Sequence, residues 1–141
     1  MKPEKRITDF FKKHHVLTLA TCDTNQPWCS NCFYVYLPEE NLLAFTSDKE
    51  TRHIMEGLAN SKVAGSIVLE TRIIGKIQGI QFMGLLEEPG ENLYETVKKT
   101  YLKRFPIARL MDTTMWIIRL SYIKMTDNQL GFGKKLIWNL S

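Results

Sequence analysis

Three short β-type segments follow one another early in this chain, and the segments between them are too short to hold a helix. Residues 15–22, 28–37 and 42–47 are rich in β-branched, aromatic and other apolar side chains. The intervening residues 23–27 and 38–41 are made of Asp, Thr, Asn, Gln, Pro and Glu, which favour turns. Consecutive strands joined by short turns pair antiparallel, so the sequence predicts an antiparallel sheet.

The rest of the chain adds short strands and helices to this beginning. A short helix is predicted after Pro3, because Ile7, Phe10 and Phe11 have helical spacing, and further helices are predicted at 50–59 and 93–105. Further strands are predicted at 62–70, 73–87, 115–126 and 134–138, the second of them interrupted by glycines. This pattern predicts a mainly β fold, a β-barrel with peripheral helices. No linker or repeat divides residues 1–141, so we expect a single domain.

Composition narrows the cellular context. The chain has 141 residues, of which 44% are hydrophobic, but it contains no apolar run of about 18 residues that could form a transmembrane helix. The N-terminal segment is too charged for the apolar core of a signal peptide. Three cysteines are an odd number, in a chain of a size that does not need disulfides. We therefore expect a cytoplasmic protein with no membrane partner.

The chain is mildly basic, with a formal net charge of +4. Lys98, Lys99, Lys103 and Arg104 gather on one predicted helix, as in some proteins that bind nucleic acids. Acidic residues are interleaved with these cations and no nucleic-acid-binding motif is present, so a solvated helix face and no nucleic-acid partner are expected. A small anionic ligand explains the surplus charge equally well.

The junction between strand 42–47 and the following helix has the composition of an anion site. Hydroxyl groups, a cation and an imidazole gather there, on Thr46, Ser47, Thr51, Arg52 and His53. The start of a helix also offers free backbone N–H groups and the positive end of the helix dipole, which suit a phosphate monoester. The alternative is an ordinary helix start with Ser47 or Asp48 as the N-cap and Arg52 in solvent.

No catalytic side chain can be identified from the sequence. Cys29 and Cys32 have the spacing of a redox or zinc motif, but they lie within a predicted strand, where residues three apart face opposite sides. The remaining Cys and His residues supply no second ligand pair at zinc-finger spacing, so no metal site is expected. The protein therefore either takes its chemistry from a cofactor or has none.

Several segments together resemble a known group of proteins. They are Trp28–Tyr34, Lys49–His53, Gly79–Gly84, Lys103–Pro106 and Leu130–Lys135. With the order of predicted strands, they resemble the pyridoxamine 5′-phosphate oxidase-like FMN-binding split β-barrel superfamily. Within it, the chain is most similar to short, uncharacterised bacterial proteins, the YhbP-like subgroup.

The resemblance implies a six-stranded antiparallel split barrel that forms a homodimer, with one FMN in each of two grooves at the subunit interface. The second strand would contact the flavin ring and the end of the third strand would hold the phosphate. The implied cofactor-binding residues are Ser30, Asn31, Cys32, Phe33, Thr46, Ser47, Thr51, Arg52, His53 and Gln81, with Lys135 contributed by the partner subunit and Lys134 as its one-residue alternative.

Departures from the superfamily pattern leave the substrate unknown. His53 stands where the superfamily has a lysine, Lys135 replaces an arginine, and Tyr34 and Val35 replace the basic residues that bind the vitamin substrate. Two functions remain open, an FMN-binding oxidoreductase-like protein and a non-catalytic sensor or store of a flavin, haem or another anion. Haem and a deazaflavin are less expected than FMN; the conceivable haem ligands are His14, His15 and His53.

Overall fold

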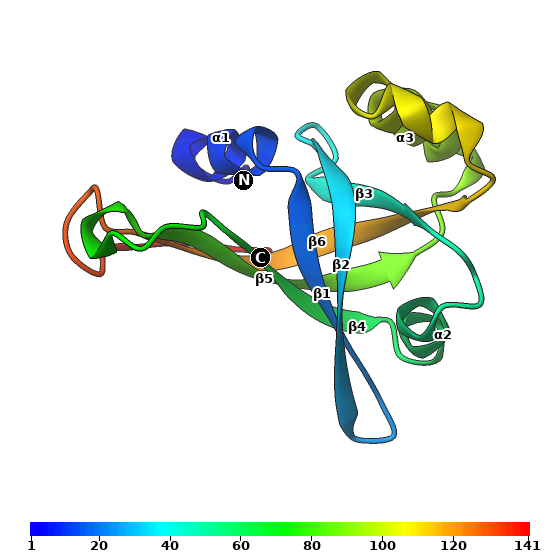
Figure 1. Cartoon of the computed structure of the whole chain (residues 1–141), viewed down its shortest axis with the longest axis horizontal. Helices are drawn as coiled ribbons and strands as arrows, with labels where there is room; N and C mark the ends of the chain where they lie inside the picture. The colour runs from blue at the N-terminus through cyan, green and yellow to red at the C-terminus, as the bar shows by residue number, and fades with distance from the viewer.

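The computed structural model describes residues 1–141, and its seven strands form one antiparallel sheet (Figure 1). The strands are β1 (Val16–Asp23), β2 (Gln26–Leu37), β3 (Leu42–Ser47), β4 (Lys62–Val68), β5 (Gln78–Glu87), β6 (Thr114–Asp127) and β7 (Lys135–Asn139). The turn between β1 and β2 is tight, with Thr24 and Asn25 at φ of 54° and 66°. Such left-handed residues match the twist of a two-residue hairpin.

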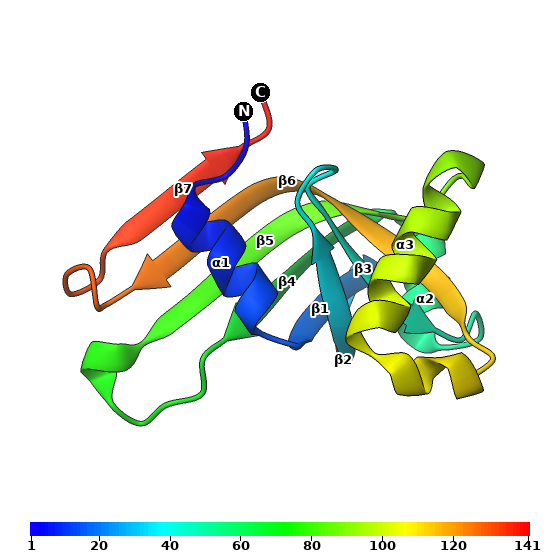
Figure 2. The same cartoon turned by 90° about the horizontal axis from the view of Figure 1, so that it is seen from above.

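The sheet closes on itself, as a barrel requires. Its strand order is β3-β2-β1-β4-β5-β6-β7, and β3 also pairs with β6. Six strands therefore form the ring, while β7 extends the sheet, so the predicted six-stranded sheet has seven strands. The 14-residue β6 explains the difference, because its first half pairs with β3 and its second half with β7. Beyond the ring, β5, β6 and β7 continue as an arm (Figures 1 and 2).

Three α-helices and two 3-10 turns surround the sheet. They are α1 (Lys5–Lys13), α2 (Arg52–Ala59), η1 (Ile74–Lys76), α3 (Glu91–Arg104) and η2 (Pro106–Leu110). The helix predicted at 50–59 begins two residues later than expected. The strand predicted at 73–87 begins only at Gln78, because the reversal from β4 to antiparallel β5 uses the η1 turn.

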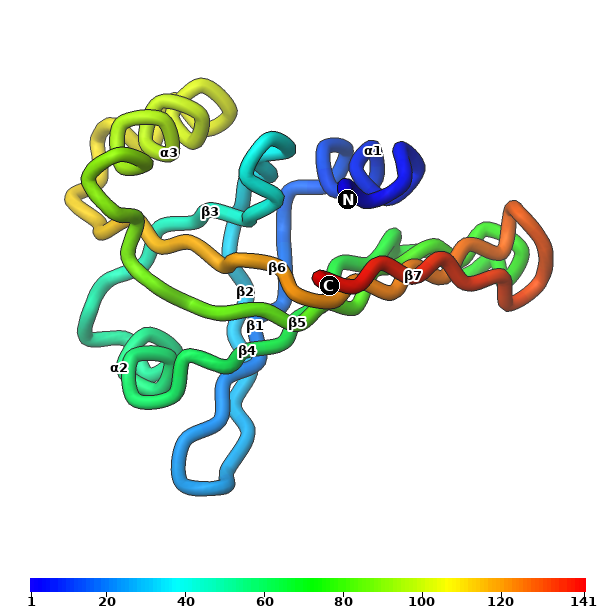
Figure 3. Tube along the Cα trace, turned by 180° about the vertical axis from the view of Figure 1, so that it is seen from behind, coloured from blue at the N-terminus to red at the C-terminus, as the bar shows by residue number.

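Alternating side chains divide the barrel into an inside and an outside. The inner cluster has 22 buried residues, among them Phe11, Tyr34 and Trp116. A second cluster of eight buried residues lies between α3 and the outer face of β2, β3 and β6, where Val97 and Tyr101 of the helix meet Ala44. The outer wall over β1, β4 and β5 has no helix on it, in contrast to the part under α3 (Figure 3).

Arg104, at the end of α3, joins distant parts of the chain. Its guanidinium donates hydrogen bonds to the carbonyl oxygens of Lys12, His14 and Tyr34, the last at 3.2 Å. Tyr34 in turn donates its hydroxyl to the carbonyl oxygen of Phe11 at 2.7 Å. The prediction that Arg104 belongs to a solvated basic face was therefore wrong; it holds the end of α1 against β2 and α3.

Glycines permit close contacts inside the wall. A Cβ on Gly84 would lie 2.4 Å from the carbonyl oxygen of Arg119, next to a bulge in the β5–β6 pairing. A Cβ on Gly65 would lie 2.2 Å from the Phe82 ring and 2.5 Å from the Thr18 carbonyl oxygen. Of the glycines that interrupt the predicted strand 73–87, Gly84 therefore has a close neighbour, whereas Gly75 has no heavy atom within 4 Å of its Cβ position.

Candidate functional site

Three predicted site residues converge where β3 runs into α2. Ser47 Oγ lies 2.7 Å from His53 Nε2 and 3.4 Å from Thr51 Oγ1, and Thr51 Oγ1 lies 3.4 Å from His53 Nε2. The buried indole of Trp116 donates to the Ser47 carbonyl oxygen at 2.9 Å, which fixes the end of β3. We call Ser47, Thr51 and His53 the junction cluster.

The backbone beside the junction cluster has free hydrogen-bond donors. Thr51 is the N-cap residue of α2 and no side chain caps the helix, so the alternative of an ordinary helix start capped by Ser47 or Asp48 is not what the structure has. The backbone N–H groups of Arg52, His53 and Ile54 donate to no protein acceptor. Free N–H groups at the positive end of a helix dipole form a binding place for an anion such as a phosphate.

His53 is the titratable member of the cluster. Partial burial holds the pKa of the His53 imidazole below its ordinary value, because the charged ring loses hydration there. This shift favours the neutral ring in the free protein. A bound anion would favour the protonated ring, so His53 can become positively charged when an anion binds.

Arg52 is held in place beside the cluster and is not simply solvated. Its Nε donates to Glu56 Oε2 at 2.8 Å, and its guanidinium lies 4.0 Å from the centre of the Trp28 ring. The hydroxyl of buried Thr21 donates to the other oxygen of Glu56 at 2.9 Å. The Arg52 hydrogen bond lowers the pKa of the Glu56 carboxyl, with a smaller effect in the same direction from Thr21. Glu56, Thr21 and Trp28 were missed as site residues, although the four-residue spacing of Arg52 and Glu56 was a visible signal.

Thr46 lies apart from the junction cluster, although it precedes Ser47. Successive strand residues face opposite sides, and Thr46 faces α3, where its hydroxyl donates to the Tyr101 hydroxyl at 3.3 Å. It lines a cavity of about 210 Å³ together with Lys98 and Arg109. The structure therefore separates the predicted hydroxyl pair into two places.

The second group of polar side chains forms a row across the uncovered outer wall. Direct cross-strand pairing joins Asn31 to Thr18, Thr18 to Ser66, Ser66 to Gln81 and Gln81 to Lys124. Residues directly opposite each other point to the same face of a sheet. We call Asn31, Thr18, Ser66, Gln81 and Lys124 the wall row; it crosses β2, β1, β4, β5 and β6. Within it, the Thr18 hydroxyl donates to Asn31 Oδ1 at 3.0 Å.

Apolar side chains surround the wall row and leave a hollow beside it. Phe33, Val68 and Met83 are 59%, 68% and 50% exposed, which is high for residues of this type. A cavity of about 310 Å³ is lined in part by Ser66 and Gln81. A polar row within exposed apolar surface offers both hydrogen bonds and packing area to a flat ligand. Gln81 and Asn31, predicted from the resemblance, lie together here; Thr18, Ser66 and Lys124 were missed.

The alternate residues of β2 face the interior. Cys32 is only 8% exposed, and burial raises the pKa of its thiol to about 11, so the thiolate is disfavoured. Ser30, two positions earlier, points to the same face. Their side chains therefore do not reach the wall row, and any ligand on the wall meets only their main chain. Cys29 is exposed while Cys32 is buried, as predicted for opposite faces of a strand.

Lys135 lies in another part of the molecule. It begins β7 on the arm, whereas the junction cluster lies beside α2 at the other end of the sheet (Figure 2). One chain therefore does not bring Lys135 together with Ser47, Thr51 and His53. The structure contains no group of three or more His, Cys, Asp or Glu residues arranged to hold a metal ion. None of its helices is both long and apolar enough to cross a membrane.

Several solved structures share this fold. A heme binding protein from Mycobacterium smegmatis superposes with a TM-score of 0.79 at 17% identity, over 99% of this chain and 59% of that chain. A FAD-binding protein from Mesorhizobium loti gives a TM-score of 0.71 at 14% identity, over 85% and 91% of the two chains. HutZ, a heme storage protein from Vibrio cholerae, gives 0.68 at 19% identity, over 86% and 92%. The predicted mainly β fold, a split barrel with peripheral helices, is confirmed.

Sequence relatives identify the family. A UPF0306 protein from Cronobacter sakazakii is 41% identical over 135 residues, which cover 94% of this chain and 92% of the relative. A UPF0306 protein from Yersinia pestis bv. Antiqua (strain Angola) is 38% identical over 133 residues, covering 94% and 90%. No family model matches the sequence. The chain belongs to the UPF0306 family.

Proposed function

We propose that this protein is a homodimeric flavin-binding protein of the oxidoreductase-like type, with FMN as its flavin. The observation that carries the proposal is the junction cluster at a helix start whose backbone N–H groups are free. Two hydroxyls, a titratable imidazole and the neighbouring Arg52 suit the phosphate that FMN carries. The FAD-binding protein with the same fold supports a flavin, and the likeness of motifs to the YhbP-like subgroup supports FMN.

The wall row is the proposed place for the flavin ring. The polar edge of an isoalloxazine would find hydrogen-bond donors and acceptors on Asn31, Gln81, Ser66 and Lys124. Its apolar part would contact Phe33 and Met83. Bound flavin supplies hydride or single-electron chemistry. The protein's part would be to orient the ring, to hold the phosphate and to keep water from the ring face.

Two observations support a site shared by two subunits. Lys135 lies far along the arm from the junction cluster of its own chain, so a contact between Lys135 and such a cluster requires a second copy of the chain. The apolar side chains around the wall row include Val68, Met83, Leu85 and Ile137, which are 68%, 50%, 44% and 57% exposed in the single chain. Contiguous exposed apolar surface of this kind marks an interface.

The phosphate assignment is tested by replacing Arg52. Arg52→Gln should weaken FMN binding by at least ~1.5 kcal/mol, about tenfold, because one charged hydrogen bond is lost. Quenching of flavin fluorescence measures the affinity, and Arg72→Gln, an exposed arginine without an ion pair, is the matched control. The absorption spectrum of the purified wild type should show bound flavin near one per subunit. Equal FMN affinity in both variants and the wild type would remove Arg52 from the site.

The shared site is tested by mixing two variants that each bind FMN weakly. Arg52→Gln and Lys135→Gln should each bind FMN weakly. In a mixed dimer, one site carries both substitutions and the other carries neither, because a two-fold interface repeats the same contacts. Random mixing should therefore restore about a quarter of the sites. If no FMN binding returns after subunit exchange, Lys135 does not act on the partner's site. The flavin proposal itself is tested separately, by the absorption spectrum of the purified wild type.

A haem-binding function is the second candidate, because two proteins with this fold are described as heme binding and heme storage proteins. His53 is engaged by Ser47, and His14 has its Nε2 buried. His15 is exposed and its ring centre lies 6.3 Å from that of Phe105, so it is the histidine best placed to ligate haem. A Soret band that survives gel filtration and is lost in His15→Ala would establish this candidate.

The free cysteines suit a reducing compartment, and we place the protein in the cytoplasm.

A further inference from the structure

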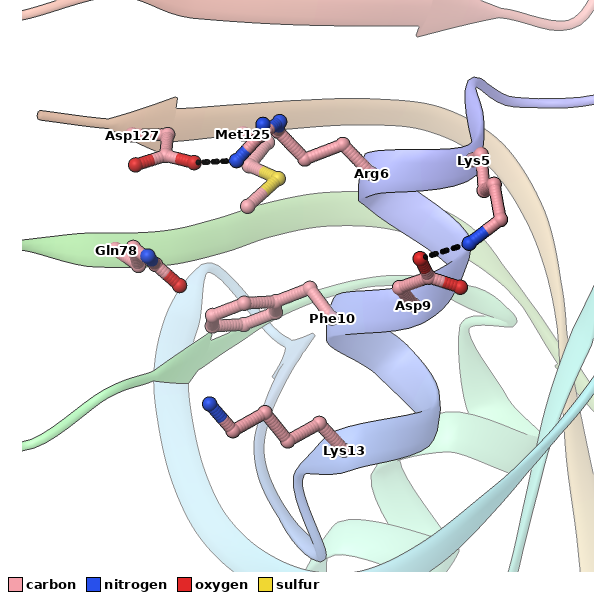
Figure 4. A pocket seen from close by; sticks show the side chains of 8 residues that line it. All are labelled: Lys5, Arg6, Asp9, Phe10, Lys13, Gln78, Met125 and Asp127. Carbon is pink, nitrogen blue, oxygen red and sulfur yellow. Dashed lines mark hydrogen bonds and ion pairs between the residues drawn. The ribbon is translucent and has the colours of Figure 1, made fainter. Parts of the chain in front are cut away.

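A separate cavity lies between α1 and the base of the arm. Its volume is about 480 Å³, within the range of small-molecule sites. Lys5, Arg6, Asp9, Phe10 and Lys13 of α1 line one side, and Gln78, Met125 and Asp127 line the other (Figure 4). None of these residues belongs to the junction cluster or to the wall row. Met125 and Asp127 point to the inner face of β6, opposite to Lys124 of the wall row.

The charges around this cavity are unequal. Lys5 Nζ pairs with Asp9 at 2.6 Å, and Arg6 Nη1 pairs with Asp127 Oδ2 at 3.0 Å. Both carboxylates are therefore occupied by a cation, and Lys13 remains without an acidic partner. In Figure 4 its amino group extends along the cavity toward the side on which Phe10 and Gln78 lie. The cavity thus presents one uncompensated positive charge to a ligand.

Arg6 supplies a second point of attachment. Asp127 is completely buried, and its other carboxylate oxygen accepts the backbone N–H of Gln129 at 2.9 Å. This pairing fixes the Arg6 guanidinium at the edge of the cavity, where its side chain is 46% exposed. A guanidinium has five N–H donors and only one bonds to Asp127, so further donors remain for a ligand.

The spacing of the two cations indicates the class of ligand. Arg6 and Lys13 are two helical turns apart, ~10 Å along the axis of α1, and Phe10 lies between them. We propose that this cavity binds a small organic dianion, with one acidic group at Arg6, the other at Lys13, and the carbon chain along Phe10. Dicarboxylates of about six carbons have this form. The site is distinct from the junction cluster and from the wall row, with which it shares no residue; Gln78 also lines the hollow beside the wall row.

The test is a titration of the full-length, isotope-labelled protein with adipate, followed by the shifts of its backbone amide signals. Adipate should bind saturably and shift amides of α1, Gln78 and Asp127. Butyrate, with one carboxylate, should bind at least tenfold more weakly. Lys13→Gln should weaken adipate binding at least tenfold, and Lys13→Arg should retain it. Lys12→Gln is the matched control, because Lys12 is exposed, neighbours Lys13 and lines no part of the cavity.

Each outcome decides the proposal. An equal loss in Lys12→Gln and Lys13→Gln would mean general charge attraction and would overturn it, as would shifts that do not saturate. Adipate that displaces FMN, or that binds equally well as butyrate, would also overturn it. The Arg52→Gln variant should bind adipate like the wild type, so a failure of the flavin proposal leaves this result unchanged.

Discussion

The junction cluster and the wall row are built in opposite ways. Ser47, Thr51 and His53 lie within seven positions of one another, and a strand end followed by a helix start is enough to bring them together. The wall row takes residues from five strands, from Thr18 to Lys124, and exists only when the register of every intervening strand pair is correct. The comparison shows which half of a ligand site depends on local structure and which on the whole barrel.

The largest effect should come from disturbing the register beneath the wall row. Gly65→Ala would place a methyl group 2.2 Å from the Phe82 ring and 2.5 Å from the Thr18 carbonyl oxygen. We expect a loss of about 3 kcal/mol in the free energy of unfolding, since overpacking of a fixed core costs this much. Urea denaturation measures it, and Gly75→Ala, with open space around it, should change stability by less than ~0.5 kcal/mol. Similar urea midpoints for the two variants would show that the barrel wall accommodates the added methyl group without loss of stability.

Removing the support of Arg52 should have the next largest effect. Glu56→Gln keeps the shape of the side chain but removes the charge that orients the Arg52 guanidinium. We expect FMN binding to weaken by about fivefold, or ~1 kcal/mol, because Arg52 is no longer held in one orientation. Glu50→Gln, an exposed carboxylate just before α2, is the control. Unchanged FMN affinity in Glu56→Gln would mean that the stack on Trp28 alone positions Arg52.

A substitution in the wall row should weaken the ring contacts and leave the phosphate contacts intact. Gln81→Leu removes one neutral hydrogen-bonding group from an exposed position, which costs about threefold to fivefold in affinity, ~1 kcal/mol or less. The same loss should be found with riboflavin, which lacks the phosphate. Gln26→Leu, at the β1–β2 turn, should change neither affinity. A loss restricted to FMN would place Gln81 at the phosphate and refute the division between the two regions.

The smallest effect should be the pH dependence caused by His53. Burial lowers the pKa of the free ring and a bound phosphate raises it, so binding takes up a proton. FMN affinity should therefore increase about threefold as the pH falls from 8 to 6, and should decrease again as the pH rises. Riboflavin binding should show no such trend, and His53→Gln should reduce the dependence to that of the phosphate itself. An equal pH profile for His53→Gln and wild type would separate His53 from the anion.

The fold was largely predictable from local patterns. Alternating side chains and turn residues located most strands within one or two positions, because the solvent-facing and core-facing sides differ in polarity. The exception is residues 73–77, which were predicted as the beginning of the strand 73–87. Ile73 and Ile74 are 52% and 61% exposed, so their hydrophobicity did not indicate burial. The segment of β7 was predicted as a strand, but the resemblance implied only six strands in the sheet; the seventh is added because β6 is long enough to pair with both β3 and β7.

The candidate site was predictable only where it is local. Ser47, Thr51 and His53 were found from composition around a helix start, and the structure brings their side chains together. Thr18, Ser66 and Lys124 were not found, because isolated polar residues on three strands show no pattern until the strands are paired. The cavity beside α1 was not predicted from the sequence for the same reason, since Arg6 and Asp127 are 121 positions apart.

Arg104 makes two distant helices depend on each other. Because one guanidinium supplies the hydrogen bonds to Lys12, His14 and Tyr34, α1 cannot separate from β2 unless the end of α3 releases it. The amide hydrogens of α1 and of the last turn of α3 should therefore exchange with solvent in a single cooperative opening, although the two helices are separate elements at the left and the right of Figure 1. In hydrogen-exchange terms, we expect one cooperative unit to include both ends of this contact.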